Sequence, residues 1–222
     1  MTEDLPVVEP PFDGDAGSGS FPSASPAGAS PIVGVVLAAG TSSRFGDRNK
    51  LLATWRGEPI VRHAVHTLCE SDVDSVVVVT GHEHERVAAA VAELDATVVH
   101  NEAYETGQAT TVRQGVSAAI DRDGAAVIVA LGDMPFVSVE SVDRLVAAYR
   151  AGAGDALAAG FEGIRGNPVL FDERHFEALS DVAGDTGGRE ILLGAERAAL
   201  VETGDDGVLA DVDRPEELEE RR

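Results

Sequence analysis

Hydrophobic positions along the chain follow two patterns, and segments of the two kinds alternate. Unbroken apolar runs rich in valine and isoleucine occupy residues 32–38 (IVGVVLA), 75–81 (SVVVVTG) and 125–131 (AAVIVAL). Runs of this kind are typical of strands that are covered on both faces. The segments 59–70 and 109–120 instead place apolar residues at helical spacing, which predicts amphipathic helices. The pattern therefore predicts buried strands that alternate with helices.

The remaining segments continue this alternation. Helices are predicted at residues 84–94 and 139–150, from Glu173, from Gly188 and from Pro215, and strands at 97–100, 155–160, 167–171 and 198–202. Buried strands joined by helices indicate an α/β fold, with a mostly parallel central sheet and helices on both faces in three α/β/α layers. Because ligands bind at the carboxyl ends of strands in such sheets, the candidate binding loops follow residues 38, 80, 100 and 131.

The first 30 residues differ in composition from the rest of the chain. They are rich in Pro, Gly, Ser and Asp and hold little that could form a core. We expect residues 1–30 to form a disordered acidic tail and residues 31–222 to form a single domain. Because no leader-like segment and no membrane-spanning apolar run is visible, we expect a cytoplasmic protein.

The charge balance of the chain is strongly acidic. Asp and Glu number 39 against 17 Lys and Arg, which gives a formal net charge of −22. The acidic residues are dispersed, and a basic patch that could neutralise phosphates is missing, which argues against nucleic acid or an anionic membrane as a partner. Dispersed acid with almost no lysine is typical of a halophilic protein surface, and we hold this as a hypothesis.

The loop after the first strand contains the only lysine of the chain, Lys50, in the segment LAAGTSSRFGDRNKLL (residues 37–52). Gly40 allows a ligand to approach the backbone, and the residues after it offer amides, hydroxyls and a guanidinium to a phosphate: Thr41, Ser42, Ser43 and Arg44. The spacing fits neither a P-loop nor a dinucleotide fingerprint. Lysine offers a compact charge that can follow a moving phosphate; the alternative is a surface lysine that caps a helix or strand.

Three aspartates are candidate metal ligands. Asp133 follows the strand at 125–131, and Asp211 and Asp213 share one face if their segment is extended. One or two carboxylates together with phosphate oxygens suit Mg²⁺. The alternatives are helix caps, for Asp133 on the helix that begins near Val139 and for Asp213 on the helix that begins at Pro215.

The segment at residues 37–52 resembles the signature L-A-A-G-x-[GS]-x-R-[MF]-G-x-x-x-K-L-L of nucleotidyltransferases with the Rossmann-like nucleotide-diphospho-sugar transferase fold. Within that superfamily it is most similar to the molybdenum cofactor cytidylyltransferase group, and the resemblance covers nearly all of the chain after residue 31. It implies that Arg44 and Lys50 neutralise a triphosphate held by the loop, including Leu37, Ala38 and Ala39. It also implies that Asp133 binds Mg²⁺ with Asp213, or with Asp211 as second choice.

The resemblance assigns roles to further loops. In relatives, the base and ribose are surrounded by the positions matched here by Thr80, Gly81, Asn101, Gly107, Thr110 and Thr111. The segments RGNPVLF (165–171) and AGDTGGREIL (183–192) match stretches that line the pocket of the second substrate, which makes Asn167, Asp185 and Arg189 candidates there. Threonine, glycine and aspartate are also ordinary turn and cap residues, which is the alternative for these positions.

Together these patterns predict a Mg²⁺-dependent enzyme, with Arg44, Lys50 and Asp133 as catalytic residues. The expected reaction transfers CMP from CTP to the phosphate of molybdopterin and releases pyrophosphate. The alternatives are guanylyl transfer from GTP to the same cofactor, transfer to a sugar phosphate, and a non-catalytic nucleotide- or cofactor-binding chaperone that delivers the cofactor to a partner molybdoenzyme.

The halophile hypothesis predicts that salt stabilises the folded chain. Screening of the repulsion among 39 acidic residues should raise the melting temperature between low and molar KCl. Calorimetry or circular dichroism at several KCl concentrations measures this, and a melting temperature that does not rise would contradict the hypothesis.

Overall fold

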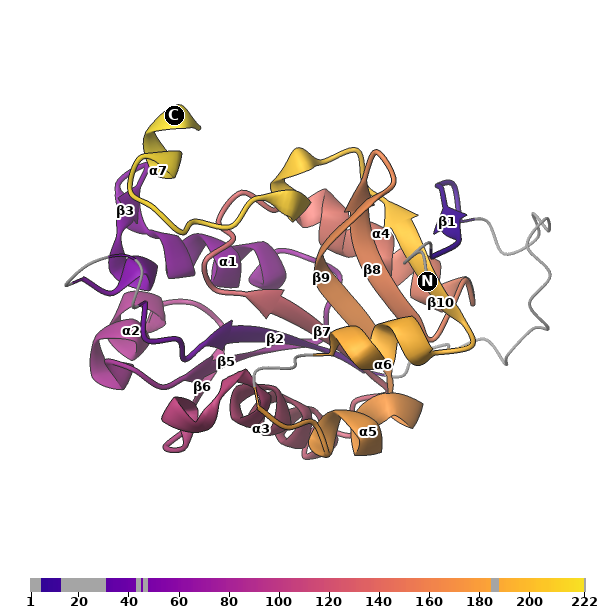
Figure 1. Cartoon of the computed structure of the whole chain (residues 1–222), viewed down its shortest axis with the longest axis horizontal. Helices are drawn as coiled ribbons and strands as arrows, with labels where there is room; N and C mark the ends of the chain where they lie inside the picture. The colour runs from indigo at the N-terminus through magenta and orange to yellow at the C-terminus, as the bar shows by residue number, and fades with distance from the viewer. Residues whose placement is uncertain (1–4, 13–30, 43–44, 46–47, 185–187, 222) are drawn as a thin grey trace.

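The computed structural model describes residues 5–12, 31–42, 45, 48–184 and 188–221. Its centre is an eight-stranded sheet in the order β1-β10-β8-β9-β7-β2-β5-β6, with helices on both faces (Figure 1). The strands are β1 Val7–Val8, β2 Ile32–Ala38, β5 Ser75–Thr80, β6 Thr97–His100, β7 Ala126–Leu131, β8 Ala156–Phe161, β9 Ile164–Asp172 and β10 Ala198–Glu202. The predicted α/β architecture is confirmed.

Pairing in the sheet is mostly parallel, as the apolar runs predict. β2 lies between β5 and β7 and is parallel to both, so that Val35 is opposite Val77 on one side and Val129 on the other. β9 is the exception, because it runs antiparallel to both β7 and β8. The start of β9 therefore lies at the edge of the sheet where β7 ends.

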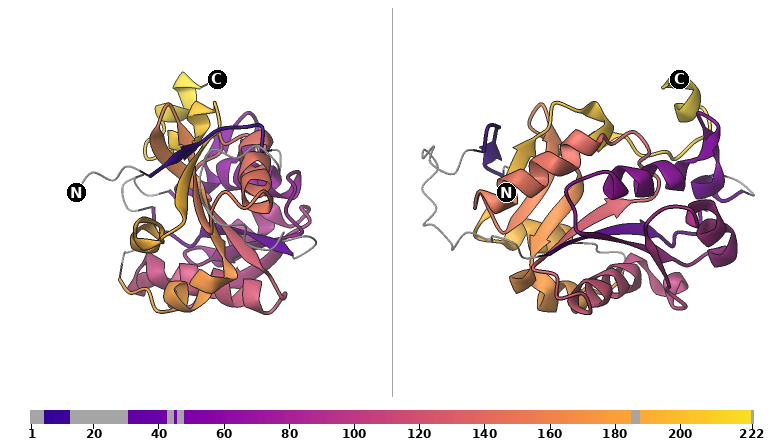
Figure 2. Two further views of the ribbon diagram at one scale, coloured as in Figure 1. Left: turned by 90° about the vertical axis from the view of Figure 1, so that its right-hand side faces the viewer. Right: turned by 180° about the vertical axis from the view of Figure 1, so that it is seen from behind.

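Six helices cover the sheet on its two faces (Figure 2). α1, α2 and α4 contribute buried residues to one apolar cluster, and α3, α5 and α6 contribute to the cluster on the opposite face. Their bounds are α1 Ile60–Cys69, α2 His84–Val91, α3 Gln108–Ile120, α4 Val139–Arg150, α5 Phe176–Ser180 and α6 Arg189–Gly194. The three-layer arrangement follows because each strand buries both faces.

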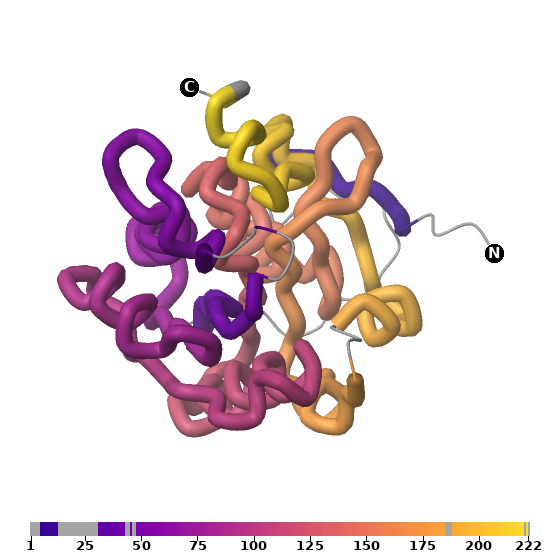
Figure 3. The backbone as a smooth tube through the Cα atoms, turned by 60° about the vertical axis from the view of Figure 1, so that its left-hand side comes forward, coloured from indigo at the N-terminus to yellow at the C-terminus, as the bar shows by residue number. Residues whose placement is uncertain are grey.

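Short elements complete the fold. They are the hairpin β3 Thr54–Trp55 and β4 Glu58–Pro59, the 3₁₀ turns η1 Lys50–Leu52, η2 Tyr104–Thr106, η3 Glu173–His175 and η4 Asp206–Leu209, and the C-terminal helix α7 Glu217–Glu220. Several of them gather with the loops at the carboxyl ends of β2, β5 and β7, on the side that Figure 3 turns toward the viewer. The candidate binding loops predicted from the sequence therefore share one edge of the sheet.

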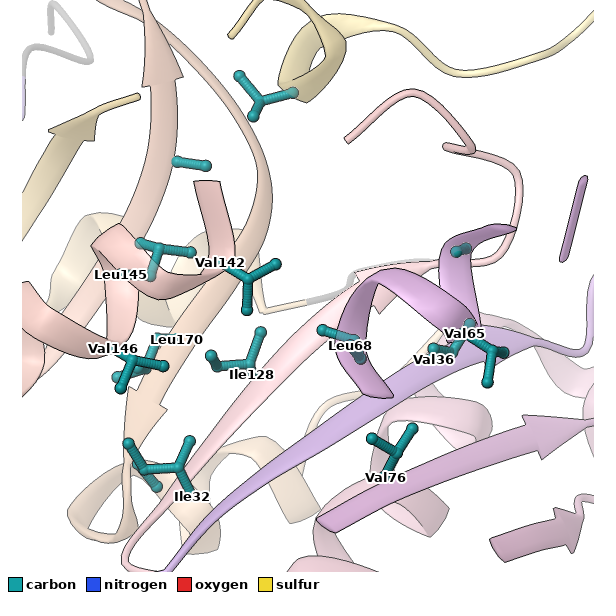
Figure 4. Packing of buried hydrophobic residues seen from close by; sticks show 14 of the residues in the cluster. Ile32, Val36, Val65, Leu68, Val76, Ile128, Val142, Leu145, Val146 and Leu170 are labelled. Carbon is teal, nitrogen blue, oxygen red and sulfur yellow. The ribbon is translucent and has the colours of Figure 1, made fainter. Parts of the chain in front are cut away.

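Alternation along β2 shows how the core is divided. Ile32 and Val36 belong to the cluster under α1 and α4, whereas Val33 and Val35 belong to the cluster under α3. Figure 4 shows Ile32 and Val36 beside residues of α1 and α4. Gly34 lies on the α1 side, where an added Cβ would come within 3.0 Å of Leu68 Cδ1. Glycine therefore lets α1 pack closely on the central strand.

The expectation that residues 1–30 are disordered and that structure begins at Pro31 is wrong for the described residues 5–12. β1 pairs in parallel with β10, so that Val7 is opposite Leu200, and the backbone amide of Leu200 donates to the Pro6 carbonyl at 2.8 Å. Val8 and Phe12 pack against the main core cluster. A short apolar segment needs little length to extend an open sheet edge, and the surrounding Pro-, Gly- and Ser-rich composition concealed it. Residues 13–30 lie outside the described residues.

Among the residues that the structure describes, no helix is both long and apolar enough to cross a bilayer.

Asp205 connects the turn η4 to the start of α4. One carboxylate oxygen accepts hydrogen bonds from the Ser138 amide at 2.9 Å and the Ser141 hydroxyl at 2.7 Å, and the other accepts from the Gly207 amide at 2.8 Å. Burial works to raise the pKa of Asp205, but these hydrogen bonds outweigh it and lower the pKa. The ionised carboxylate is therefore stabilised by folding.

We predict that Asp205→Asn lowers the free energy of unfolding by about 1–3 kcal/mol at pH 7, because hydrogen bonds to a charged acceptor are lost. Since the folded pKa lies below the unfolded value of about 4, this stabilisation is present above pH 4 and is lost as pH falls through the folded pKa. Urea unfolding at constant salt, at pH 7 and near pH 3, measures the difference between variant and wild type. A difference that stays constant with pH would contradict the assignment.

Candidate active site

Hydrogen bonds join the start and the end of the loop that follows β2, just before η1. The Ser42 hydroxyl donates to Asn49 Oδ1 at 3.3 Å and accepts from the Lys50 amide at 3.1 Å. Asn49 is buried and also caps η1, because its Oδ1 accepts from the Leu51 amide at 3.0 Å. These hydrogen bonds fix the position of the Lys50 backbone at the end of the loop.

Lys50 contacts two aspartates that come from distant parts of the chain. Its Nζ lies 2.6 Å from Asp133 Oδ2 and 2.9 Å from Asp213 Oδ1. The side chains of Lys50 and Asp133 are only 17% and 20% exposed, so water screens this contact poorly. Burial works to lower the pKa of Lys50, but the two carboxylates outweigh it and raise the pKa. The lysine therefore carries its charge at neutral pH.

Asp133 stands just beyond the carboxyl end of β7, as the sequence predicts. The helix-cap alternative is wrong for this residue, because α4 is capped by the side chain of Ser138. The Val212 amide donates to the Asp133 carbonyl at 2.9 Å, which brings the C-terminal segment across the end of β7. Asp213 follows directly and reaches Lys50.

Asp211 lies near the same group, but no hydrogen bond or ion pair joins its carboxylate to Lys50 within the described part of the chain. Partial burial raises the pKa of Asp211, and the carboxylates of Asp133 and Asp213 raise it further. Of the two C-terminal aspartates that are candidate metal ligands, Asp213 is thus the one that forms an ion pair with Lys50, as Asp133 does.

The acid pair suits a hard divalent cation. Asp133 and Asp213 present oxygen ligands to one point, which the ammonium group of Lys50 marks, and carboxylates with phosphate oxygens and water are the donors that Mg²⁺ takes. Within the described ranges, no group of three or more His, Cys, Asp or Glu residues could hold a metal by itself. An ion bound here would therefore need ligands from a phosphate or water.

The residues expected around the base form a buried network. Asn101 is 1% exposed, and its Nδ2 donates to the hydroxyls of Thr110 at 2.8 Å and Thr111 at 3.0 Å. Thr80 is also buried, and its hydroxyl donates to the Val99 carbonyl at 3.2 Å. Asn101 thus holds the loop after β6 against α3, and Thr80 joins the end of β5 to β6.

Glycines shape the same region. A Cβ at Gly81 would come within 2.6 Å of Tyr104 Cβ and 2.8 Å of Ala39 Cβ, so no larger residue fits there. Gly107, with φ at 118°, joins η2 to α3. At Gly40, by contrast, an added Cβ would meet no atom of the described residues within 4 Å. The space over Gly40 agrees with a loop that a ligand approaches.

The other residues of the predicted phosphate loop divide into three groups. Leu37, Ala38 and Ala39 are buried, and Leu37 also contributes to the lining of a cavity of about 280 Å³. Thr41 is exposed. Ser43 and Arg44, together with the second-substrate candidate Asp185, lie outside the described residues.

A cavity of about 280 Å³ opens next to the acid pair on the face covered by α3, α5 and α6. Leu131, two residues before Asp133, is part of its lining. Most of its wall is apolar, and its polar lining residues are Gln108, Arg165, Asn167 and Arg189. The structure thus brings together Asn167 and Arg189, two residues predicted for the second substrate.

Sequence reasoning did not single out Arg165, and it placed Gln108 only within the segment 107–111 expected around the base and ribose. Arg165 was detectable, because it stands two positions before Asn167 in a strand and side chains two apart share a face. Gln108 begins α3 directly after Gly107 and carries no comparable signal.

Comparison with known proteins places the chain among nucleotide-handling enzymes. Residues 34–200 match the family described as MobA-like NTP transferase domain. The chain is 32% identical over 200 residues to the purine catabolism protein PucB of Bacillus subtilis (strain 168), covering 85% of this chain and 94% of that protein. It is 30% identical over 196 residues to nicotine blue oxidoreductase of Paenarthrobacter nicotinovorans, covering 84% and 94%.

A solved structure supports the fold. Rv0371c from Mycobacterium tuberculosis H37Rv superposes with a TM-score of 0.71 at 23% identity, covering 86% of this chain and 96% of that one. A complex of Rv0371c with manganese superposes with a TM-score of 0.60 at 22% identity, covering 84% and 91%.

Proposed function

This chain belongs to the MobA-like NTP transferase domain family and is a nucleotidyltransferase, and we propose that it transfers CMP from CTP to the phosphate of a molybdopterin cofactor, with Mg²⁺. The observation that carries the proposal is the meeting of Lys50 with Asp133 and Asp213 at 2.6 and 2.9 Å, where β7 ends beside the loop after β2. A mobile cation and two carboxylates at one point are what a triphosphate with its metal requires.

The reaction needs alignment and charge neutralisation more than a protein nucleophile. A phosphate oxygen of the acceptor attacks the α-phosphorus of the triphosphate, and the bond to the leaving pyrophosphate breaks. Mg²⁺, held by Asp133 and Asp213, would supply neutralisation of the phosphate oxygens. Lys50 would move from the carboxylates toward the triphosphate and stabilise the charge that grows on pyrophosphate. Arg44 is proposed to assist it.

The cavity beside the acid pair supports an acceptor with a flat, partly apolar body. Its wall combines side chains of β7, β9, α3, α5 and α6, among them Val112, Val129, Phe171 and Leu192. An apolar wall of this kind suits a heterocycle better than a sugar, whose hydroxyls need many hydrogen-bond partners. Arg165 and Arg189 add positive charge in a chain of net charge −22. We propose that these arginines, with Asn167 and Asp185, bind the molybdopterin.

The choice of CTP rests on the resemblance to the cytidylyltransferase group in the segments 37–52, 165–171 and 183–192. The buried network of Asn101, Thr110 and Thr111 would set the shape of the base pocket. GTP in place of CTP, a sugar phosphate as acceptor, and a binding protein without catalysis are the other outcomes that the following experiment separates.

The test incubates the protein with each of CTP, GTP, ATP and UTP, together with Mg²⁺ and molybdopterin, and measures pyrophosphate. We expect release with CTP, and we expect Asp133→Asn to lower the rate by at least about 100-fold, because the metal loses a ligand. Asp121→Asn, which removes an equal charge at the exposed end of α3, is the matched control and should match wild type. Release with GTP alone would overturn the cytidylyl assignment, and no release with any triphosphate or acceptor would favour the binding protein.

Lys50→Arg should lower turnover more than triphosphate affinity. Arginine keeps the charge, but its planar fork prefers one carboxylate in a fixed bidentate contact, whereas Lys50 bridges two. We expect kcat to fall by about tenfold or more while KM for the triphosphate changes by less than about threefold. The inverse exchange at the exposed neighbour, Arg48→Lys, is the control. Equal loss in both constants would show that Lys50 contributes only to binding.

A further inference from the structure

The C-terminal segment at residues 210–221, here called the C-terminal strap, supplies Asp213 to the site although it lies beyond the matched residues 34–200. It ends in α7, which Figure 1 shows next to β3. Two buried residues, Val212 and Leu218, join the strap to an apolar cluster with Trp55 and Ile60. The Trp55 Nε1 also donates to the Arg221 carbonyl at 3.3 Å. The strap is therefore docked on both sides of Asp213.

The Asp213 side chain is 40% exposed, and its Oδ1 accepts from Lys50 Nζ at 2.9 Å. Water competes for a carboxylate with this exposure, so the position of its backbone matters for the contact. What fixes the backbone at this point is Glu217, whose Oε2 accepts from the Asp213 amide at 2.7 Å and from the Arg214 amide at 2.9 Å. One carboxylate oxygen thus closes the turn from residue 213 to residue 217.

The charge of Glu217 indicates that its two hydrogen bonds do more than stabilise α7. Glu217 places a second negative group close to Asp213 in a chain that is already strongly acidic, and like charges repel. As the first residue of a four-residue helix, it has little helix to stabilise. The two amide hydrogen bonds matter because they hold the backbone of Asp213, whose carboxylate contacts Lys50 together with Asp133.

We propose that Glu217 is a positioning residue that holds the backbone of Asp213 where its carboxylate meets Lys50 together with Asp133, and that this favours the binding of one divalent cation by the two carboxylates. Glu217 itself does not touch the cation. Residues behind metal ligands commonly change metal affinity by 10- to 100-fold when they are removed. This inference rests on the proposed function, since it requires Asp133 and Asp213 to be the metal carboxylates.

Mn²⁺ is the probe ion, because free Mn²⁺ is counted directly by electron paramagnetic resonance and no turnover is needed. The full chain is titrated with Mn²⁺ alone, because a triphosphate would itself bind the ion and lower the free Mn²⁺ that is counted. We expect Glu217→Ala to raise the Mn²⁺ Kd by about tenfold. Glu217→Gln should stay within about twofold of wild type, because its side-chain oxygen still accepts both amide hydrogens. Glu216→Ala, an equal loss of charge at the exposed neighbouring position, should leave the Kd unchanged.

A double variant separates positioning from a general structural effect. In an Asp213→Asn background, Glu217→Ala should add no further loss of Mn²⁺ affinity, since there is no carboxylate left to orient. Additive losses would overturn the proposal, as would a wild-type Kd in Glu217→Ala or an equal loss in Glu216→Ala. If Asp213→Asn alone leaves the Kd unchanged, the metal site of the proposed function is wrong and the failure lies there.

Trp55, the chain's only tryptophan, reports whether the strap stays docked. Its ring packs on Phe136 with centroids 5.0 Å apart, and the guanidinium of Arg221 lies 4.9 Å from the Phe136 ring. We expect unchanged Trp55 emission in Glu217→Ala. A shifted emission together with lost Mn²⁺ binding would mean that Glu217 anchors the whole strap, which would overturn the local positioning role.

Discussion

The contact of one ammonium group with two carboxylates is the constraint around which the site is built. Asp133 and Asp213 repel each other unless a cation lies between them, and Lys50 lies within 3 Å of both. Ion pairs with little exposure contribute weakly to stability, because removing the charges from water costs nearly as much as their attraction returns. Stability alone therefore explains little of this arrangement, which lies at the edge of the sheet where ligands bind in such folds.

The topology of the sheet explains why this contact and the cavity are neighbours. Parallel strands deliver the loops after β2, β5 and β7 to one edge, which is the usual position of ligands in such folds. β9 then runs against β7, with Val169 opposite Val129, so its first residues return to the edge where β7 ends. Arg165 and Asn167 consequently line a cavity that begins two residues before Asp133. A single antiparallel strand thus brings Arg165 and Asn167 to the edge of the sheet at which β7 ends before Asp133.

Both ends of the chain complete the domain from outside the matched residues 34–200. β1 adds a strand to β10 and packs Val8 and Phe12 against the core, which covers an edge that would otherwise expose unpaired backbone groups. The C-terminal strap crosses the opposite side and brings Asp213 to Lys50. Residues 34–200 thus supply most of the sheet, and the segments on either side of them supply β1 and Asp213, one of the two carboxylates that contact Lys50.

The sequence by itself determined the fold class and most elements, and it predicted that Lys50 and Asp133 lie close together. Unbroken valine-rich runs between helical segments are typical of buried parallel strands, whose carboxyl ends share one edge of the sheet. Tertiary structure alone decided which C-terminal aspartate meets Lys50, that Arg165 and Gln108 join Asn167 and Arg189 at one cavity, and that residues 5–12 form part of the sheet. The physical reason is that these contacts join residues that lie far apart in the sequence. Periodicity records whether a residue is buried, whereas a contact between residues 50 and 213, or a strand added at an open edge, depends on packing between segments whose local sequences carry no trace of each other.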